Sequence, residues 1–186
     1  WTRISGDLSR TGGSISAIAP APSDPLTIWV GTNDGNVQLT TDGGATWTAR
    51  SGALPERVVT DIAVDRNDAR TAIVTFSGFG LPHVHRTNDG GASWTSISDG
   101  LPDVPVNAVL THPALGDDIY IGTDLGAFRS ADSGATWTPF NPGLPNVAVF
   151  DLAYSNETGR VTAATHGRGM FSHSPDVASS VTFADD

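Results

Sequence analysis

The chain of 186 residues contains neither cysteine nor lysine. Without cysteine it can form no disulfide framework and no thiolate metal site. Its 10 basic residues are therefore all arginines, and they stand against 20 acidic residues, which gives a formal net charge of −10 at pH 7. This balance argues against a nucleic-acid-binding protein, because affinity for phosphate groups requires clustered positive charge.

Long apolar runs are also missing. No stretch approaches the roughly 20 residues that a membrane-spanning helix needs, and no signal peptide can be recognised. No segment combines helical periodicity with enough length to be predicted as a helix. The chain begins with Trp1 rather than methionine, so we interpret its start as a processed or truncated end, before which further domains of the same protein could lie.

Glycine and proline are abundant, with 21 and 12 residues respectively. Short runs rich in threonine, valine and isoleucine alternate with these residues and with aspartate and asparagine. This composition is typical of an all-β protein with many turns. The length suffices to bury a substantial hydrophobic core within one domain.

One octapeptide occurs three times, as TTDGGATW at 40–47, TNDGGASW at 87–94 and SADSGATW at 130–137. Its final tryptophans are 47 and 43 residues apart, and Trp1 lies 46 residues before Trp47. Trp1 is followed by TRIS as Trp47 is followed by TARS, so the chain starts at the final tryptophan of a fourth octapeptide. A period of about 40–50 residues with a fixed motif predicts a propeller or a solenoid.

Each unit reads as four short antiparallel strands, which is the pattern of one propeller blade. We therefore predict an all-β propeller with four visible blade units, at about 1–46, 47–93, 94–136 and 137–173, followed by a tail or linker at 174–186. The last unit supplies only three strands, and we expect residues 1–5 to pair with residues 169–173 and close the ring. Further blades of the same protein could instead complete a larger ring.

The octapeptides resemble the motif of the Asp-box, or BNR, repeat family, [Ser/Thr]-x-Asp-x-Gly-x-x-Trp, at every specified position. That family includes sialidases, sortilin-type receptor domains, xyloglucan-hydrolysing enzymes and photosystem II assembly factors. The resemblance covers residues 1–173 and implies a β-propeller whose Asp boxes lie on the periphery, away from the ligand face. The last unit departs from the motif, since SHSPDV puts Pro175 where the aspartate should stand.

The residue types of the octapeptide favour a structural role over contact with a ligand. An aspartate in a tight turn accepts hydrogen bonds from nearby main-chain N–H groups, glycine permits a positive φ, and tryptophan buries a large apolar ring. The residues to which we assign this role are Thr40, Asp42, Gly44 and Trp47 in the first copy, Thr87, Asp89, Gly91 and Trp94 in the second, and Ser130, Asp132, Gly134 and Trp137 in the third.

Candidate binding residues lie in the loops that join the second strand of each unit to the third, on the face opposite the octapeptides. These loops contribute Asp34, Phe79, Leu81, His83, Asp124, Leu125, His166 and Arg168. Asp34 and Asp124 are more simply explained as turn residues. The run ATHGRG around His166 resembles one that is common near the end of bacterial proteins of the family, and we interpret it mainly as a closing turn.

Asp61 and Asp151 occupy the same position on the innermost strands of the second and fourth units, near the central channel. We expect both to accept main-chain N–H groups, because a buried carboxylate is costly without hydrogen bonds. The alternative is a carboxylate pair or a structural site for Ca²⁺ or Na⁺. The one close histidine pair, His83 and His85, lacks a third metal ligand, so we expect no metal centre and no cofactor.

Residues for catalysis are scarce. A sialidase-like mechanism needs an arginine cluster, an acid, and a tyrosine nucleophile assisted by a glutamate, but the chain has only Glu56 and Glu157, and only Tyr120 and Tyr154. The leading interpretation is a non-catalytic binding or scaffolding module of an exported bacterial protein, extracellular or periplasmic, that contacts carbohydrate or protein. The alternatives are a fragment of a sialidase- or xyloglucanase-like glycoside hydrolase and an assembly-factor-like interaction domain.

Overall fold

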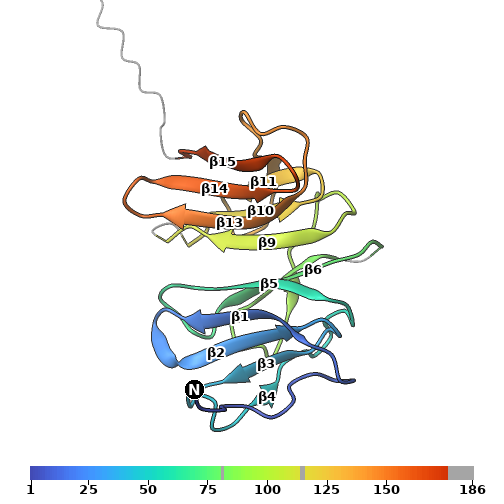
Figure 1. Ribbon diagram of the computed structural model, residues 1–186, viewed down its shortest axis with the longest axis vertical. Helices are drawn as coiled ribbons and strands as arrows, with labels where there is room; N and C mark the ends of the chain where they lie inside the picture. Colours follow the sequence, from blue (N-terminus) through green and yellow to red (C-terminus); the bar gives the residue numbers. More distant parts are fainter. Residues whose placement is uncertain (81, 114–115, 176–186) are drawn as a thin grey trace, which may run out of the picture.

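The computed structural model describes residues 1–80, 82–113 and 116–175, and every regular element in that part of the chain is a β-strand. The strands form four antiparallel sheets, which we call blades 1 to 4 in chain order (Figure 1). Blades 1 to 3 have four strands each and blade 4 has three. Leu81 and the tail from residue 176 lie outside the described residues.

The bounds of the strands follow the repeat. Blade 1 contains β1 (Ile15–Ala21), β2 (Asp24–Thr32), β3 (Val37–Thr40) and β4 (Thr48–Ala49). Blade 2 contains β5 (Val59–Val64), β6 (Ala72–Phe76), β7 (Val84–Thr87) and β8 (Thr95–Ser96). Blade 3 contains β9 (Val106–Thr111), β10 (Ile119–Thr123), β11 (Gly126–Ser130) and β12 (Thr138–Pro139), and blade 4 contains β13 (Val149–Ser155), β14 (Arg160–Thr165) and β15 (Gly169–His173).

The blades are stacked in chain order through their first strands. β1 packs beside β5, β5 beside β9, and β9 beside β13. Figure 1 shows blade 1 at the end of the stack that carries the N-terminus and β15 at the opposite end. The predicted all-β fold with four blade units is therefore confirmed.

The hydrophobic core is divided into three clusters, one between each pair of neighbouring blades. Trp29 and Phe76 belong to the cluster between blades 1 and 2, Ile73 and Ile119 to that between blades 2 and 3, and Tyr120 to that between blades 3 and 4. Side chains alternate between the two faces of a strand, so one sheet can supply both of its neighbours. A blade inside the stack consequently buries both of its faces.

Each octapeptide forms a turn that satisfies its own polar groups. In the first, Thr40 Oγ1 donates to Asp42 at 2.7 Å and accepts the Gly44 N–H at 2.9 Å, while Asp42 accepts both the N–H and the hydroxyl of Thr46. The same bonds link Thr87, Asp89, Gly91 and Ser93 in the second copy, and Ser130, Asp132, Gly134 and Thr136 in the third.

The tryptophan that ends each octapeptide reaches into the preceding part of the chain. Trp94 Nε1 donates to the carbonyl oxygen of Arg50 at 2.7 Å, and Trp137 Nε1 donates to that of Ile97 at 2.7 Å. The glycine of the turn allows this close approach, since a Cβ on Gly91, where φ is +77°, would lie 2.7 Å from the Cβ of Arg50. Each octapeptide is thus a joint between one blade and the fourth strand of the blade before it.

The N-terminal segment is placed by the same rule. Trp47 Nε1 donates to the carbonyl oxygen of Ile4 at 2.9 Å, so residues 1–5 lie where the fourth strand of a preceding blade would lie. They form no strand of their own, and β15 pairs with β14 alone in the part of the chain that the structure describes. The predicted pairing of residues 1–5 with β15 is therefore not confirmed, because the bond from Trp47 holds this segment at the opposite end of the stack (Figure 1).

Replacement of Asp89 tests the joint. Hydrogen bonds from Ser93 and Thr87 hold the pKa of Asp89 well below its usual range, so its carboxylate stabilises the turn in ionised form. We expect Asp89→Ala to lower the melting temperature by several degrees, measured by circular dichroism. The reason is that the main-chain N–H and the hydroxyl of Ser93 both lose their acceptor. Asp99→Ala, an exposed aspartate that makes no hydrogen bond among the described residues, should change it by less than about 2 °C. Equal melting temperatures for the two variants would contradict the structural role.

Candidate functional site

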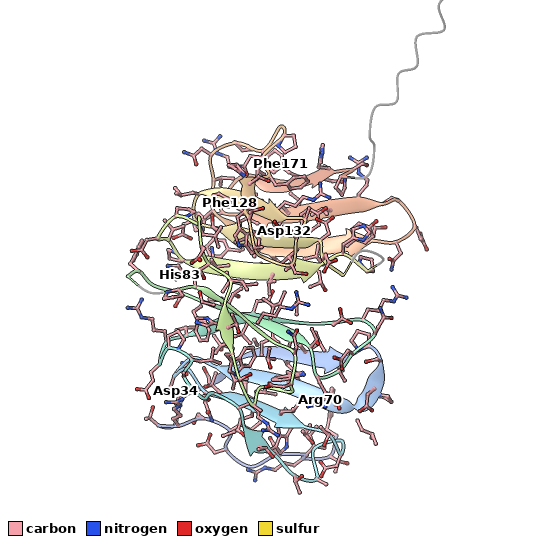
Figure 2. The ribbon with its side chains drawn as sticks, turned by 180° about the vertical axis from the view of Figure 1, so that it is seen from behind. Asp34, Arg70, His83, Phe128, Asp132 and Phe171 are labelled. Atoms are coloured by element: carbon pink, nitrogen blue, oxygen red, sulfur yellow. The ribbon has the colours of Figure 1, made fainter. Side chains whose placement is uncertain are left out.

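The face opposite the octapeptides carries the candidate site. The β2–β3, β6–β7, β10–β11 and β14–β15 loops meet there with the segments that connect one blade to the next. Figure 2 shows Asp34 and His83 along one edge of the stack, whereas Arg70, from the β5–β6 loop, lies along the other. The loop face therefore collects residues from every blade.

Asp34 ties the N-terminal segment to blade 1. Its carboxylate accepts the main-chain N–H groups of Arg10 and Thr11, both at 2.8 Å, and the hydroxyl of Thr32 at 2.5 Å. The Thr32 bond and these N–H donors hold the pKa of Asp34 far below its usual range. Arg10 also forms an ion pair with Glu56 in the next connecting segment. Asp34 thus has the partners of a structural residue.

His83 and Asp103 form the corresponding bridge between blades 2 and 3. His83 Nε2 lies 2.9 Å from Asp103 Oδ1, and the His83 side chain is only 3% exposed. Asp103 also accepts the Gly80 N–H at 2.7 Å, and this bond, followed by that to His83, lowers the pKa of Asp103. His83 is therefore buried against the segment that connects blades 2 and 3 rather than presented to a ligand.

Asp124 is held in a similar way. Asn107 Nδ2 donates to Asp124 Oδ1 at 3.0 Å and to the carbonyl oxygen of Val149 at 3.2 Å. The amide thereby joins the β10–β11 loop to the first strand of blade 4. Each of the three polar candidates is hydrogen-bonded within the protein, namely Asp34, His83 and Asp124.

The exposed part of the loop face includes apolar side chains and Arg168, together with carboxylates such as that of Asp103, which is 59% exposed. Phe79 is 61% exposed and Leu125 is 47% exposed. Phe150 is 49% exposed and its ring lies 5.5 Å from that of His166. Arg168 is exposed in the β14–β15 loop, which also carries His166. Phe79 and Leu125, from the β6–β7 and β10–β11 loops of neighbouring blades, are together called the apolar patch below.

The two inner-strand carboxylates accept main-chain donors. Asp61 Oδ1 accepts the Ile62 N–H and Asp61 Oδ2 accepts the Val109 N–H of blade 3, each at 2.8 Å. Burial raises the pKa of Asp61, and the charge of Asp151 adds to this effect. Asp151 accepts the Leu152 N–H at 2.8 Å. Within the described residues, no group of three His, Cys, Asp or Glu side chains is placed to hold a metal ion.

Sequence reasoning missed a further set of residues that join the inner strands. The hydroxyl of Ser16 donates to the Val59 carbonyl at 2.6 Å, and the hydroxyl of Thr60 donates to the Val106 carbonyl at 2.6 Å. Asn107 makes the equivalent bond to Val149. The signal was a polar side chain at the second position of three inner strands, a pattern that becomes informative only when the strands are known to be neighbours.

Comparison with known proteins supports the fold. No protein-family model and no curated protein sequence matches the chain. Among solved structures, the GH74 xyloglucanase from Xanthomonas campestris aligns with a TM-score of 0.70 and 19% identity, over 87% of this chain and 29% of the enzyme. YCF48 bound to a D1 peptide aligns with a TM-score of 0.64 and 22% identity, over 88% and 52% of the two chains. The computationally designed protein Ika4 aligns with a TM-score of 0.69 and 11% identity, over 94% and 98%.

These similarities define the class of the protein, which has the β-propeller fold. At such low identities they show the fold alone, and function has to be argued from the site. The chain spans 26%, 22% and 29% of the length of three GH74 enzymes that it matches. Among the described residues, no helix is long and apolar enough to cross a membrane.

Buried His85 gives the protein a testable pH dependence. Its ring packs against Phe76, and burial, followed by the effect of His83, lowers the pKa of His85 to about 4. The unfolded chain therefore takes up a proton on this residue first as the pH falls below its ordinary pKa of 6.5, which favours unfolding. We expect the free energy of unfolding to decrease by up to about 2 kcal/mol from pH 7 to pH 5 through this group.

Urea unfolding at the two pH values measures this effect. His85→Leu should remove most of the decrease, whereas His166→Leu, at an exposed position, should keep it. The same decrease in both variants would show that His85 does not titrate as its burial requires.

Proposed function

We propose that this chain is a non-catalytic binding module that recognises a protein through its loop face. The observation that supports the proposal is that the polar candidates on that face have partners within the protein, whereas apolar side chains there are exposed to solvent. Asp34, His83 and Asp124 are hydrogen-bonded within the protein, while Phe79 and Leu125 remain accessible. Exposed aromatic and apolar side chains that cluster on a polar surface are typical of interaction sites.

A protein partner suits this face better than a carbohydrate does. Binding of a sugar depends on free polar groups that fix the orientation of its hydroxyls. The carboxylates of Asp34 and Asp103 instead accept bonds from neighbouring loops. YCF48, which has a similar fold, was solved with a bound D1 peptide, and this supports an interaction role of the assembly-factor kind.

The hydrolase interpretation rests on similarity to the GH74 enzymes and on the inner-strand carboxylates. Glycoside hydrolysis generally requires a carboxylic acid and a second carboxylate about 5–10 Å apart, both able to reach the substrate. Asp61 has the raised pKa of a candidate acid, but both of its oxygens accept main-chain N–H groups. It lacks a free oxygen to donate a proton to a leaving group, so we favour binding over hydrolysis.

The proposal includes two further points. We assign the octapeptides to the Asp-box repeat, because their turns and tryptophans act as joints between blades. We also place the protein outside the cytoplasm of a bacterium, in keeping with that resemblance. Mass spectrometry of periplasmic and culture fractions of the source organism tests this location.

Selection from a peptide display library tests the binding role. We expect peptides rich in apolar residues to be selected, since Phe79 and Leu125 are exposed on this face. Phe79→Ser combined with Leu125→Ser should weaken their binding at least about tenfold, because interface energy concentrates in such side chains. Leu26→Ser is the matched control, as Leu26 is 54% exposed at the octapeptide end of blade 1. Binding that survives the double variant would reject the apolar patch as the site, and selective binding to a glycan array through these residues would make the partner a carbohydrate.

An activity screen tests the absence of catalysis. We expect no turnover of xyloglucan oligomers, β-glucans or sialosides by the purified chain, because its inner carboxylates are committed to main-chain donors. Turnover that is abolished by Asp61→Asn, Asp151→Asn, Asp34→Asn or Asp124→Asn in a folded variant would overturn the proposal and establish a hydrolase.

A further inference from the structure

The joint between blades 3 and 4 lacks the tryptophan that fills the other joints. Trp94 packs edge-on against Trp29, with ring centroids 5.9 Å apart, between blades 1 and 2, and Trp137 packs in the cluster between blades 2 and 3. Blade 4 has no octapeptide, and the corresponding place is an apolar groove with a volume of about 170 Å³. The side chains that line it include Tyr120, Phe140, Leu144, Leu152 and Phe171.

The groove also offers the matching acceptor. The carbonyl groups that receive the indole N–H belong to Ile4, Arg50 and Ile97, and each of these residues lies three positions after a tryptophan. Phe140 lies three positions after Trp137. Among the described residues, no donor bonds to the carbonyl of Phe140. The groove therefore offers apolar walls and a main-chain acceptor for an indole ring.

Trp1 occupies no groove of this kind within its own chain. It is fully exposed, although it begins the sequence Trp1 to Ser5 that matches residues 47–51. Residues 1–5 correspond to a fourth strand without its blade, and blade 4 has no fourth strand among the described residues. The two lie at opposite ends of the stack, with Phe171 in the last blade and Asp34 near the first (Figure 2), so one copy cannot supply its own missing strand.

The inner strands at the two ends are complementary as well. Asp61 links blade 2 to blade 3 by accepting the N–H of Val109, a residue that follows an alanine. Asp151 matches Asp61, but no residue of a following blade bonds to it within the described chain. Ile18 in β1 matches Val109, follows Ala17, and is 65% exposed. An Ile18 N–H from another copy would complete the bond for Asp151.

Apolar side chains at both ends of the stack support the same match. Ile15 is 54% exposed at one end, and Phe150 and Met170 are 49% and 76% exposed at the other. Phe150 stands where the other inner strands have Ser16, Thr60 and Asn107, which bond to the first residue of the next inner strand. At the open end, that first residue would be Ile15, so an apolar contact replaces the polar bond.

We propose that two copies of this chain associate head to tail into one closed ring of eight blades. In each joint, residues 1–5 of one copy form the fourth strand of blade 4 of the other, and Trp1 fills the groove between blades 3 and 4. A ring of this kind covers the edge of β15 that has no partner among the described residues and would be open to pairing with other chains. It also buries the exposed outer faces of blades 1 and 4. Blades 2 and 3, which lie inside the stack, already bury both of their faces.

Disulfide trapping tests the register, and the absence of cysteine gives a clean background. In blade 2 Thr95 pairs with Arg86, and in blade 3 Thr138 pairs with Arg129. The equivalent pair across the proposed joint is Thr2 with Ser172. We expect the double variant Thr2→Cys, Ser172→Cys to form a covalent dimer on oxidation, and each single variant to remain uncrosslinked. A disulfide within one chain would show closure of a four-bladed ring and overturn the proposal, as would the absence of any crosslink.

Analytical ultracentrifugation tests the assembly. We expect a particle of twice the 19.3 kDa chain mass, and Trp1→Ala and Met170→Arg should each weaken the dimer at least about tenfold. Both side chains are exposed in the single chain, so neither change should unfold it, and Val58→Ser, at a 37% exposed position between blades 1 and 2, serves as the apolar control. Mixing the two variants should partly restore the dimer, because one of its two joints then has an intact Trp1 and an intact blade 4. A monomeric parent chain, a dimer insensitive to Trp1→Ala, or an open polymer would each refute the two-copy ring.

Discussion

The structure depends on one repeated interaction, in which the indole N–H of a tryptophan in one blade donates a hydrogen bond to a main-chain carbonyl oxygen of the blade before it. Trp94 and Trp137 each make this bond at 2.7 Å, and each brings a large apolar ring between two sheets. The described chain has no helix to cover a sheet face, and the sequence has no disulfide to fix the blades. Because each tryptophan couples only neighbouring blades, the stack is a linear series of similar joints, and the outermost faces are left unsatisfied.

The polar side chains of the loop face also connect one blade or segment with the next. Asp103 receives the Gly80 N–H and contacts His83, and Asp34 receives the N–H groups of Arg10 and Thr11. A carboxylate bound in this way stays ionised to low pH, as the lowered pKa of Asp103 reflects, and it is a poor general acid. Apolar side chains such as Phe79 are left to face the solvent, which suits recognition of another surface better than bond cleavage.

The parts of the structure that could be predicted from the sequence are those whose partners lie close together in the chain. The octapeptide turn closes within a few residues, as in the bond from Ser93 to Asp89, so residue types alone were informative. The main-chain partners of Asp34 lie 23 and 24 residues away, and the residue that Asp61 contacts in blade 3 is 48 residues away. Such contacts depend on how blades are placed relative to each other, which a single strand pattern does not encode. The ring closure expected for residues 1–5 was not confirmed for the same reason, since the sequence showed a missing strand but not which blade held the segment.

The inner strands show why the two ends of the stack fit each other. Their joints are of two kinds. A Cβ on Gly31 would lie 2.3 Å from a methyl of Val59, and a Cβ on Gly122 would lie 2.7 Å from a methyl of Val149. Blade 1 therefore packs closely on blade 2, and blade 3 packs closely on blade 4. Blade 2 instead meets blade 3 through Asp61, whose burial raises its pKa and makes its ionised form costly at neutral pH unless N–H donors offset the lost water. The close-packed and the carboxylate joints alternate, so a stack that begins with Ala17 and Gly31 and ends with Asp151 presents unlike ends. Only an even number of blades keeps this alternation around a closed ring, and two copies of a four-bladed stack satisfy this condition.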